Sequence, residues 1–231
     1  MRARLPESYD DLILNSPGLV LYVPCSDSDN VAREVKGWTN GAFSGTVGRL
    51  APSPMLRDQR PGFKFTGVSG SKVVGTATTL PYLAADNASW MIWAYLTPSV
   101  TGDQSNFCGF GTTALTPVNG GVRGIIRFPS KVCLWGQNQD IQGSADYDLN
   151  LPQCIVCTKS GSTTATLYRN GVQLGTSSAK SYIDCATQDW WIALKHGLTS
   201  ELSNTVVAKY AVWNRTLPPA EARHYYTEGM C

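Results

Sequence analysis

The stretch that decides the fold is Ala88-Ser-Trp-Met-Ile-Trp-Ala-Tyr-Leu-Thr-Pro98. In a β-strand its even and odd positions fall on opposite faces, Trp90, Ile92, Ala94 and Leu96 against Met91, Trp93, Tyr95 and Thr97. Both sets are large and mostly apolar, so a strand here must be covered on both faces. A helix is the competing interpretation, but the β-branched and aromatic content and the stop at Pro98 favour a strand. The stretch therefore predicts a central strand of a packed β-sandwich.

The composition of the 231-residue chain fits one all-β domain. Only 16% of its residues are charged, and its 22 glycines and 13 prolines suit many short strands joined by turns. The net charge of +2 offers no basic surface for nucleic acid. No stretch is long and apolar enough to cross a membrane, and the first seven residues lack the apolar run of a secretory signal. We therefore expect a protein made in a cytoplasm, with neither nucleic acid nor a membrane as a partner.

The seven cysteines are expected to be reduced thiols. An odd count without a signal peptide argues against a disulfide framework. Cys154 and Cys157 have the spacing of a redox motif, but positions three apart in a strand face opposite sides. The two histidines, His196 and His224, are too few for a closed zinc site without a second cysteine pair. We predict no metal and no cofactor.

The remaining patterns predict about ten to twelve strands with a helix near each end of the chain. Helices are predicted at residues 6–15 and 217–226, each with proline near its first turn, and the second is expected to end before Gly229. Residues 49–61, with their prolines, predict a long surface connection, and residues 102–111 a bridge between strands. The clearest strands are residues 19–23, 62–67, 71–75, 122–128, 131–135, 153–158, 188–195 and 206–213.

Asn170-Gly171 predicts a type I′ hairpin, because both central residues of that turn need a positive φ. The expected register pairs Arg169 with Val172, Tyr168 with Gln173, and Leu167 with Leu174. No helix alternates with the strands, as it would in a parallel sheet. The predicted architecture is therefore an antiparallel two-sheet sandwich.

Five short motifs, taken in order over residues 12–229, resemble the concanavalin A-like, laminin-G-like domains. They are Ser16-Pro-Gly-Leu-Val-Leu-Tyr22, Phe65-Thr-Gly67, Trp90-Met-Ile-Trp-Ala-Tyr-Leu-Thr-Pro98, Leu167-Tyr-Arg-Asn-Gly171 and Ala211-Val-Trp-Asn-Arg-Thr-Leu217. The resemblance implies an all-β jelly-roll sandwich of two antiparallel sheets with short N- and C-terminal helices. It divides the chain into an arm and helix over residues 1–16 and one sandwich domain over residues 17–231. Similar domains are binding and structural modules, frequent in tailed-phage particles.

The chain departs from this family where metal binding and catalysis would need it. Relatives often carry Ile-Asp-Glu entering the last strand, whose Asp can help hold calcium, whereas this chain has Val207-Ala208-Lys209. Glucanases of the superfamily use Glu-x-Asp-x-x-Glu, and the five glutamates of this chain lack that spacing, so no catalytic residue is predicted. Asp27 with Asp29, and the run Asp146-Tyr-Asp-Leu-Asn150, are weak calcium candidates for which solvated turns are the favoured interpretation.

Two functions stay open ahead of a glycoside hydrolase, which the missing carboxylate pair disfavours. The first is a structural protein of a tailed-phage virion, a head decoration or tail-associated protein. Its arm, with Arg2 and Arg4, would dock on capsid or tail subunits or on another copy of the chain. The second is a glycan-binding, lectin-like module. Trp93, Trp135 and Trp191 are its candidates, because alternation turns them away from the inter-sheet core unless loops or the terminal helices cover them.

Overall fold

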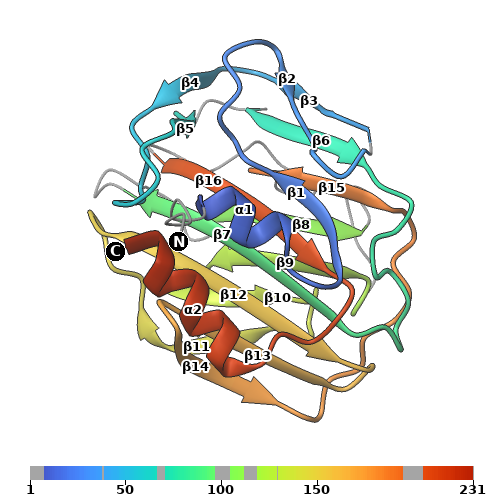
Figure 1. Cartoon of the computed structure of the whole chain (residues 1–231). Coiled ribbons are helices and arrows are strands. Elements are labelled where there is room, and N and C mark those ends of the chain that lie inside the picture. Colours follow the sequence, from blue (N-terminus) through green and yellow to red (C-terminus); the bar gives the residue numbers. More distant parts are fainter. Residues whose placement is uncertain are drawn as a thin grey trace, which may run out of the picture.

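Two antiparallel sheets pack face to face in the computed structural model, which describes residues 8–37, 39–66, 71–96, 105–111, 119–128, 130–194 and 205–230 (Figure 1). Sheet A has the order β14-β13-β12-β7-β16-β5-β4, with β1 also paired to β16. Its strands are β1 (Leu19–Val23), β4 (Val47–Ala51), β5 (Gly62–Phe65), β7 (Ala88–Leu96), β12 (Pro152–Ser160), β13 (Thr164–Arg169), β14 (Val172–Ser177) and β16 (Thr205–Trp213). The predicted two-sheet sandwich is confirmed.

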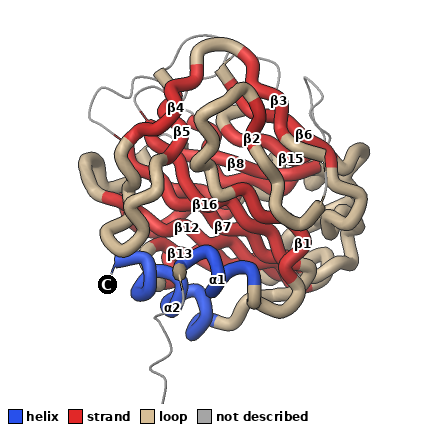
Figure 2. The backbone as a smooth tube through the Cα atoms, turned by 45° about the horizontal axis from the view of Figure 1, so that its top comes forward, coloured by secondary structure: helices blue, strands red, loops and turns tan. Residues whose placement is uncertain are grey.

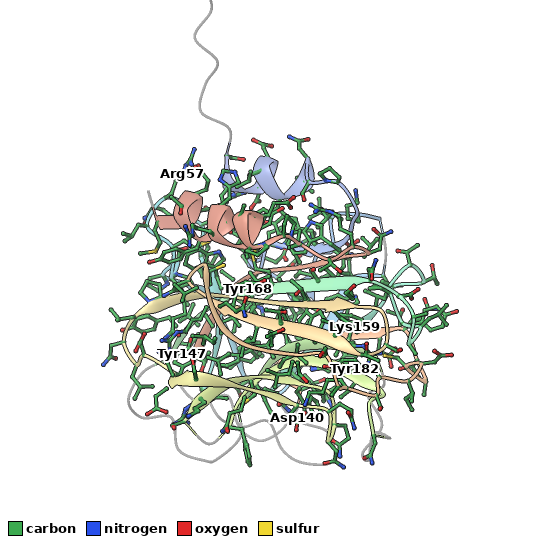
Figure 3. All side chains as sticks on the ribbon, turned by 90° about the horizontal axis from the view of Figure 1, so that it is seen from below. Arg57, Asp140, Tyr147, Lys159, Tyr168 and Tyr182 are labelled. Atoms are coloured by element: carbon green, nitrogen blue, oxygen red, sulfur yellow. The ribbon has the colours of Figure 1, made fainter. Side chains whose placement is uncertain are left out.

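Sheet B has the order β11-β10-β9-β8-β15-β6-β3-β2. Its strands are β2 (Val31–Ala32), β3 (Gly41–Ser44), β6 (Lys72–Thr76), β8 (Ser105–Gly111), β9 (Val122–Arg127), β10 (Lys131–Trp135), β11 (Ile141–Asp146) and β15 (Asp189–Ile192). The helices α1 (Tyr9–Leu14) and α2 (Pro219–Met230) both lie on the face of sheet A that is turned away from sheet B (Figures 2 and 3). Among the described residues, no helix is both long and apolar enough to cross a membrane.

Strand β7 is central and covered on both faces, as its sequence predicts. It lies between β12 and β16. Trp90, Ile92 and Ala94 enter the core between the sheets, whereas Met91 and Trp93 pack beneath the two helices. Fully burying a large apolar side chain contributes about 1.5–3 kcal/mol, so this strand anchors both layers of the core.

The helices begin and end at different residues from those predicted. Helix α1 begins at Tyr9, because Ser8 and Asp11 form a capping box that satisfies the first free backbone N–H groups. Helix α2 continues through Gly229 to Met230, so the prediction that Gly229 follows the helix is wrong. The reason is packing: a methyl group at Gly229 would lie 2.4 Å from Cζ2 of Trp93. Only glycine lets this helix approach the sheet so closely.

The β13–β14 hairpin is confirmed, with φ of 53° at Asn170 and 73° at Gly171. Arg169 pairs with Val172 and Tyr168 with Gln173, as predicted. The next pair differs, because a bulge between Leu167 and Tyr168 shifts the register. Leu167 therefore pairs with Gly175 and not with Leu174.

Several segments differ from their predicted structure because tertiary packing overrides local propensity. Residues 102–111 are predicted to be a bridge but contain β8, and no pattern predicts β11. Both strands are rich in glycine and polar residues, which disfavour strands in isolation. The consecutive strands β5 and β6 do not pair, since they lie in different sheets. The 49–61 connection is not wholly a surface loop, because Met55 and Asp58 are buried against sheet A.

Candidate functional site

The three candidate tryptophans all lie on outer faces of the sandwich, as predicted. Trp93 lies on the outer face of sheet A, and Trp135 and Trp191 lie on the outer face of sheet B, the face turned away from sheet A. Exposure separates them, since Trp93 and Trp191 are 0% exposed and Trp135 is half-buried. Without an exposed face, the rings of Trp93 and Trp191 cannot stack on a sugar in this conformation. The expectation of an open-face ring is therefore wrong for these two.

Helices account for the burial of Trp93. Its ring stacks on Tyr226 of α2 at a centroid distance of 6.1 Å, and its Nε1 donates a 2.8 Å hydrogen bond to the hydroxyl of Tyr9 in α1. The Tyr9 hydroxyl in turn donates to the carbonyl of Tyr225 at 3.1 Å. Trp93 is thus the point where both terminal helices are fixed to the sheet.

On the outer face of sheet B, glycines make room for flat tryptophan rings. Trp135 pairs with Gly124 across β9 and β10, and a methyl group at Gly124 would lie 3.0 Å from Cε3 of that ring. Trp191 lies over Gly109 in the same way, since a methyl group at Gly109 would lie 2.5 Å from Cζ2 of the Trp191 ring. Leu194 packs with Trp191, because φ of 62° at Ala193 reverses the alternation predicted for this segment. No helix among the described residues lies over this face (Figure 3).

A polar turn of residues 136–140 follows Trp135 directly. Its side chains carry amides and a carboxylate, and Gln137 and Asn138 adopt φ of 48° and 60°. The Asn138 amide donates to Asn119 at 2.7 Å, and Asp140 accepts a 2.8 Å hydrogen bond from the N–H of Gly136. Although Asp140 is exposed, the protein packed around its carboxylate removes part of its hydration and raises its pKa from the ordinary value. No sequence pattern singled out this turn, because Asn119 and Tyr182, which hydrogen-bond to it, are distant in sequence.

The acidic turns considered as calcium candidates are occupied by the chain's own hydrogen bonds. Asp27 and Asp29 both bind the guanidinium of Arg33, whose Nη1 lies 2.9 Å from an oxygen of each. Asp146 accepts from the Ser130 hydroxyl at 2.8 Å. Within the described ranges, no three or more His, Cys, Asp or Glu side chains gather where they could hold a metal ion.

A buried ion cluster surrounds Lys209 of β16. The Lys209 ammonium lies 3.1 Å from Asp10 and 2.9 Å from Asp58, and Arg60 contacts both carboxylates. The Tyr22 hydroxyl donates to Asp10. Burial opposes ionisation of Asp58, but hydrogen bonds from Arg60 and Lys209 outweigh it and lower its pKa to about 2. An ammonium of the chain therefore supplies the positive charge here.

A groove runs between α1 and α2, on the opposite side of the molecule from Trp135. It has a hollow of about 240 Å³ and a second of about 150 Å³, and Leu12 and His224 line both. Its two glutamates are each paired with an arginine, Glu221 with Arg215 and Glu228 with Arg57. Both carboxylates of the groove are thus engaged by arginine side chains. Of the remaining sequence candidates, Arg2, Arg4 and His196 lie outside the described residues.

No family model and no curated protein matches the chain. Solved structures with a similar fold include the sialidase of Trypanosoma rangeli in complex with 2,3-difluorosialic acid, at a TM-score of 0.66 and 17% identity over 91% of this chain. The receptor-binding domains of botulinum neurotoxin C/D mosaic and type G match over 91% with TM-scores of 0.67 and 0.64 and identities of 12% and 13%. This chain spans 33% of the sialidase and 51% of each toxin domain. At such identities the likeness shows the β-sandwich fold alone.

Proposed function

We propose that the chain is a non-catalytic carbohydrate-binding module that contacts its ligand on the outer face of sheet B. The observation that carries the proposal is that Trp135 stays partly exposed, with its ring on Gly124 beside the polar 136–140 turn. Indole rings provide a flat apolar surface for the apolar face of a pyranose. The amides of Gln137 and Asn138 provide hydrogen-bond donors and acceptors for sugar hydroxyls.

Two further observations support this reading. The similar sialidase structure holds a sialic acid derivative, and the similar toxin structures are named receptor-binding domains. A recognition role is thus compatible with the fold. The non-catalytic part of the proposal is supported by the paired state of Glu221 and Glu228 and by the absence of the glucanase carboxylate spacing from the sequence.

The binding test compares Trp135→Ala with Phe128→Ala on a panel of neutral and sialylated glycans. Phe128 is a matched control, because it is an exposed aromatic residue (41%) that follows the last residue of β9, whereas Trp135 pairs with Gly124 near the start of that strand. We expect Trp135→Ala to weaken binding about tenfold or more, the equivalent of about 1.4 kcal/mol, while Phe128→Ala binds normally. Equal binding by the folded Trp135→Ala variant, or binding of no glycan by the parent chain, would refute the proposal.

A role as a virion component, through contacts with capsid or tail subunits or another copy, is the second candidate function. It is favoured by exposed large apolar side chains, with exposed fractions of 55% for Leu151 and 59% for Val172. Deleting residues 1–5 tests the predicted docking arm with Arg2 and Arg4. Loss of particle association in this variant, with Trp135→Ala still incorporated, would favour the virion role over glycan binding.

A further inference from the structure

Two fully buried cations lie together over the ring of Tyr182, at the end of the sandwich next to the 136–140 turn (Figure 3). The guanidinium carbon of Arg123 is 4.7 Å from the ring centroid, and the Lys159 ammonium is 5.9 Å from it. They come from different sheets, Arg123 from β9 and Lys159 from β12. Like charges kept this close in the interior need a specific set of hydrogen bonds to be tolerated.

Backbone carbonyls of the connecting loops provide those hydrogen bonds. The Lys159 ammonium donates to the carbonyls of Ala84, Asp86 and Gly161, so all three of its protons are used. Arg123 donates to the carbonyls of Gly120 at 2.6 Å, Val122 at 3.0 Å and Ile183 at 2.9 Å. Apart from Val122, the residues that provide these carbonyls lie in loops and turns outside the strands.

The charged surroundings do not fully compensate for this burial. Burial, and then the neighbouring Arg123, lower the pKa of Lys159 to about 8, against the attraction of Asp86, Cys185 and Asp184. Burial also lowers the pKa of Arg123 from its ordinary value. Arg123 therefore disfavours the charged form of Lys159. Burying these two charges costs more free energy than burying neutral side chains would. What the charges provide in return is a fixed position for each loop carbonyl that they bind.

Two routes lead from this cation pair to the turn beside Trp135. The Tyr182 hydroxyl donates to the carbonyl of Gln139 at 3.3 Å, and a methyl group at Gly136 would lie 2.7 Å from Cε1 of the Tyr182 ring. Through the second route, Gly120, whose carbonyl Arg123 holds, donates its N–H to the carbonyls of Gly136 at 2.8 Å and Gln137 at 3.0 Å. Gly136 is the residue next to Trp135.

We propose that Arg123 and Lys159 are positioning residues, which act through Tyr182 and Gly120 to fix the 136–140 turn beside the ring of Trp135. The inference rests on the proposed function, because it explains how the ligand-facing turn is held in place before a ligand arrives. A turn fixed in advance loses less conformational entropy on binding. We call this arrangement of Arg123, Lys159, Tyr182 and Gly120 the clamp. Its effect on the 136–140 turn can be tested without any ligand.

The experiment uses the full chain labelled with 5-fluorotryptophan, in which the fluorine resonance of Trp135 is identified by its loss in Trp135→Phe. Lys159→Met removes one cation but keeps a stem of similar size. Lys209→Met is the matched control, because Lys209 is equally buried but contacts Asp10 of α1, whereas Trp135 lies on the other sheet. Tyr182→Phe is the milder variant, which keeps the ring and removes the hydrogen bond to Gln139.

We expect Lys159→Met and, to a smaller extent, Tyr182→Phe to shift or broaden the Trp135 resonance and Lys159→Met to weaken glycan binding about tenfold. Lys209→Met should lower thermal stability and leave that resonance in place. An unchanged Trp135 resonance in the folded Lys159→Met and Tyr182→Phe variants refutes the clamp, as does an equal shift in Lys209→Met. If Lys159→Met does not fold, Tyr182→Phe alone decides. A shifted resonance in a chain that binds no glycan supports the clamp and refutes the proposed function instead.

Discussion

Replacing Lys209 with methionine removes an ammonium that is paired with two buried carboxylates, those of Asp10 and Asp58. Methionine is similar in length to lysine, and both side chains are equally disfavoured at the positive φ of 57° found at this position. The substitution therefore changes the charge and little else. Breaking a buried ion pair costs about 3–5 kcal/mol, because the remaining charge loses its partner. Arg60 still contacts both Asp10 and Asp58, so the expected loss lies at the lower end, about 3 kcal/mol. In a domain of this size that lowers the unfolding temperature by about 6–12 °C.

The assay is urea unfolding at pH 7 of the parent chain, Lys209→Met, Asp58→Asn and the double variant. Asp58→Asn should cost less in the Lys209→Met background, since its ammonium partner at 2.9 Å is already gone. Lys64→Met, at an exposed position of β5, is the control and should change the unfolding free energy by less than about 0.5 kcal/mol. The reasoning is refuted if Lys209→Met unfolds as the control does, or if the two substitutions in the double variant are additive.

The stability of the parent chain should fall as the pH drops from about 4 to about 2, because a carboxylate with a lowered pKa contributes stability only while it is ionised. Asp58→Asn should flatten this part of the curve of unfolding temperature against pH. Gly229→Val should cost about 1–3 kcal/mol through overlap with Trp93, whereas Thr227→Val on the exposed side of α2 should be nearly neutral; equal effects would contradict the close packing. The denatured protein should titrate seven thiols without reductant, and native thiols should react slowly with a thiol reagent, since burial raises the pKa of Cys133 to about 11 and of Cys25 to about 12. Five or fewer thiols would mean at least one disulfide.

Strong local patterns were sufficient to predict the sandwich and much of its core. The alternation around Trp90 placed β7 correctly because every position carried a large apolar side chain, and Asn170-Gly171 fixed a hairpin because few dipeptides tolerate two positive φ values. Strands such as β8 could not be predicted in this way. Its glycines carry no strand signal by themselves, and Gly109 is explained only by the Trp191 ring that lies over it in the folded protein.

For the candidate site, the sequence determined which side of a sheet each tryptophan faces, because alternation is a property of the strand itself. It could not determine exposure, which depends on segments distant in sequence: α2 covers Trp93, whereas Trp135 keeps part of its surface. The partners of buried charges were likewise decided by tertiary structure. Lys209 meets Asp10 and Asp58, and Arg123 meets Tyr182, only after strands and loops from distant parts of the chain have packed, since a buried ion must be paired by whatever groups the fold brings within a few ångströms.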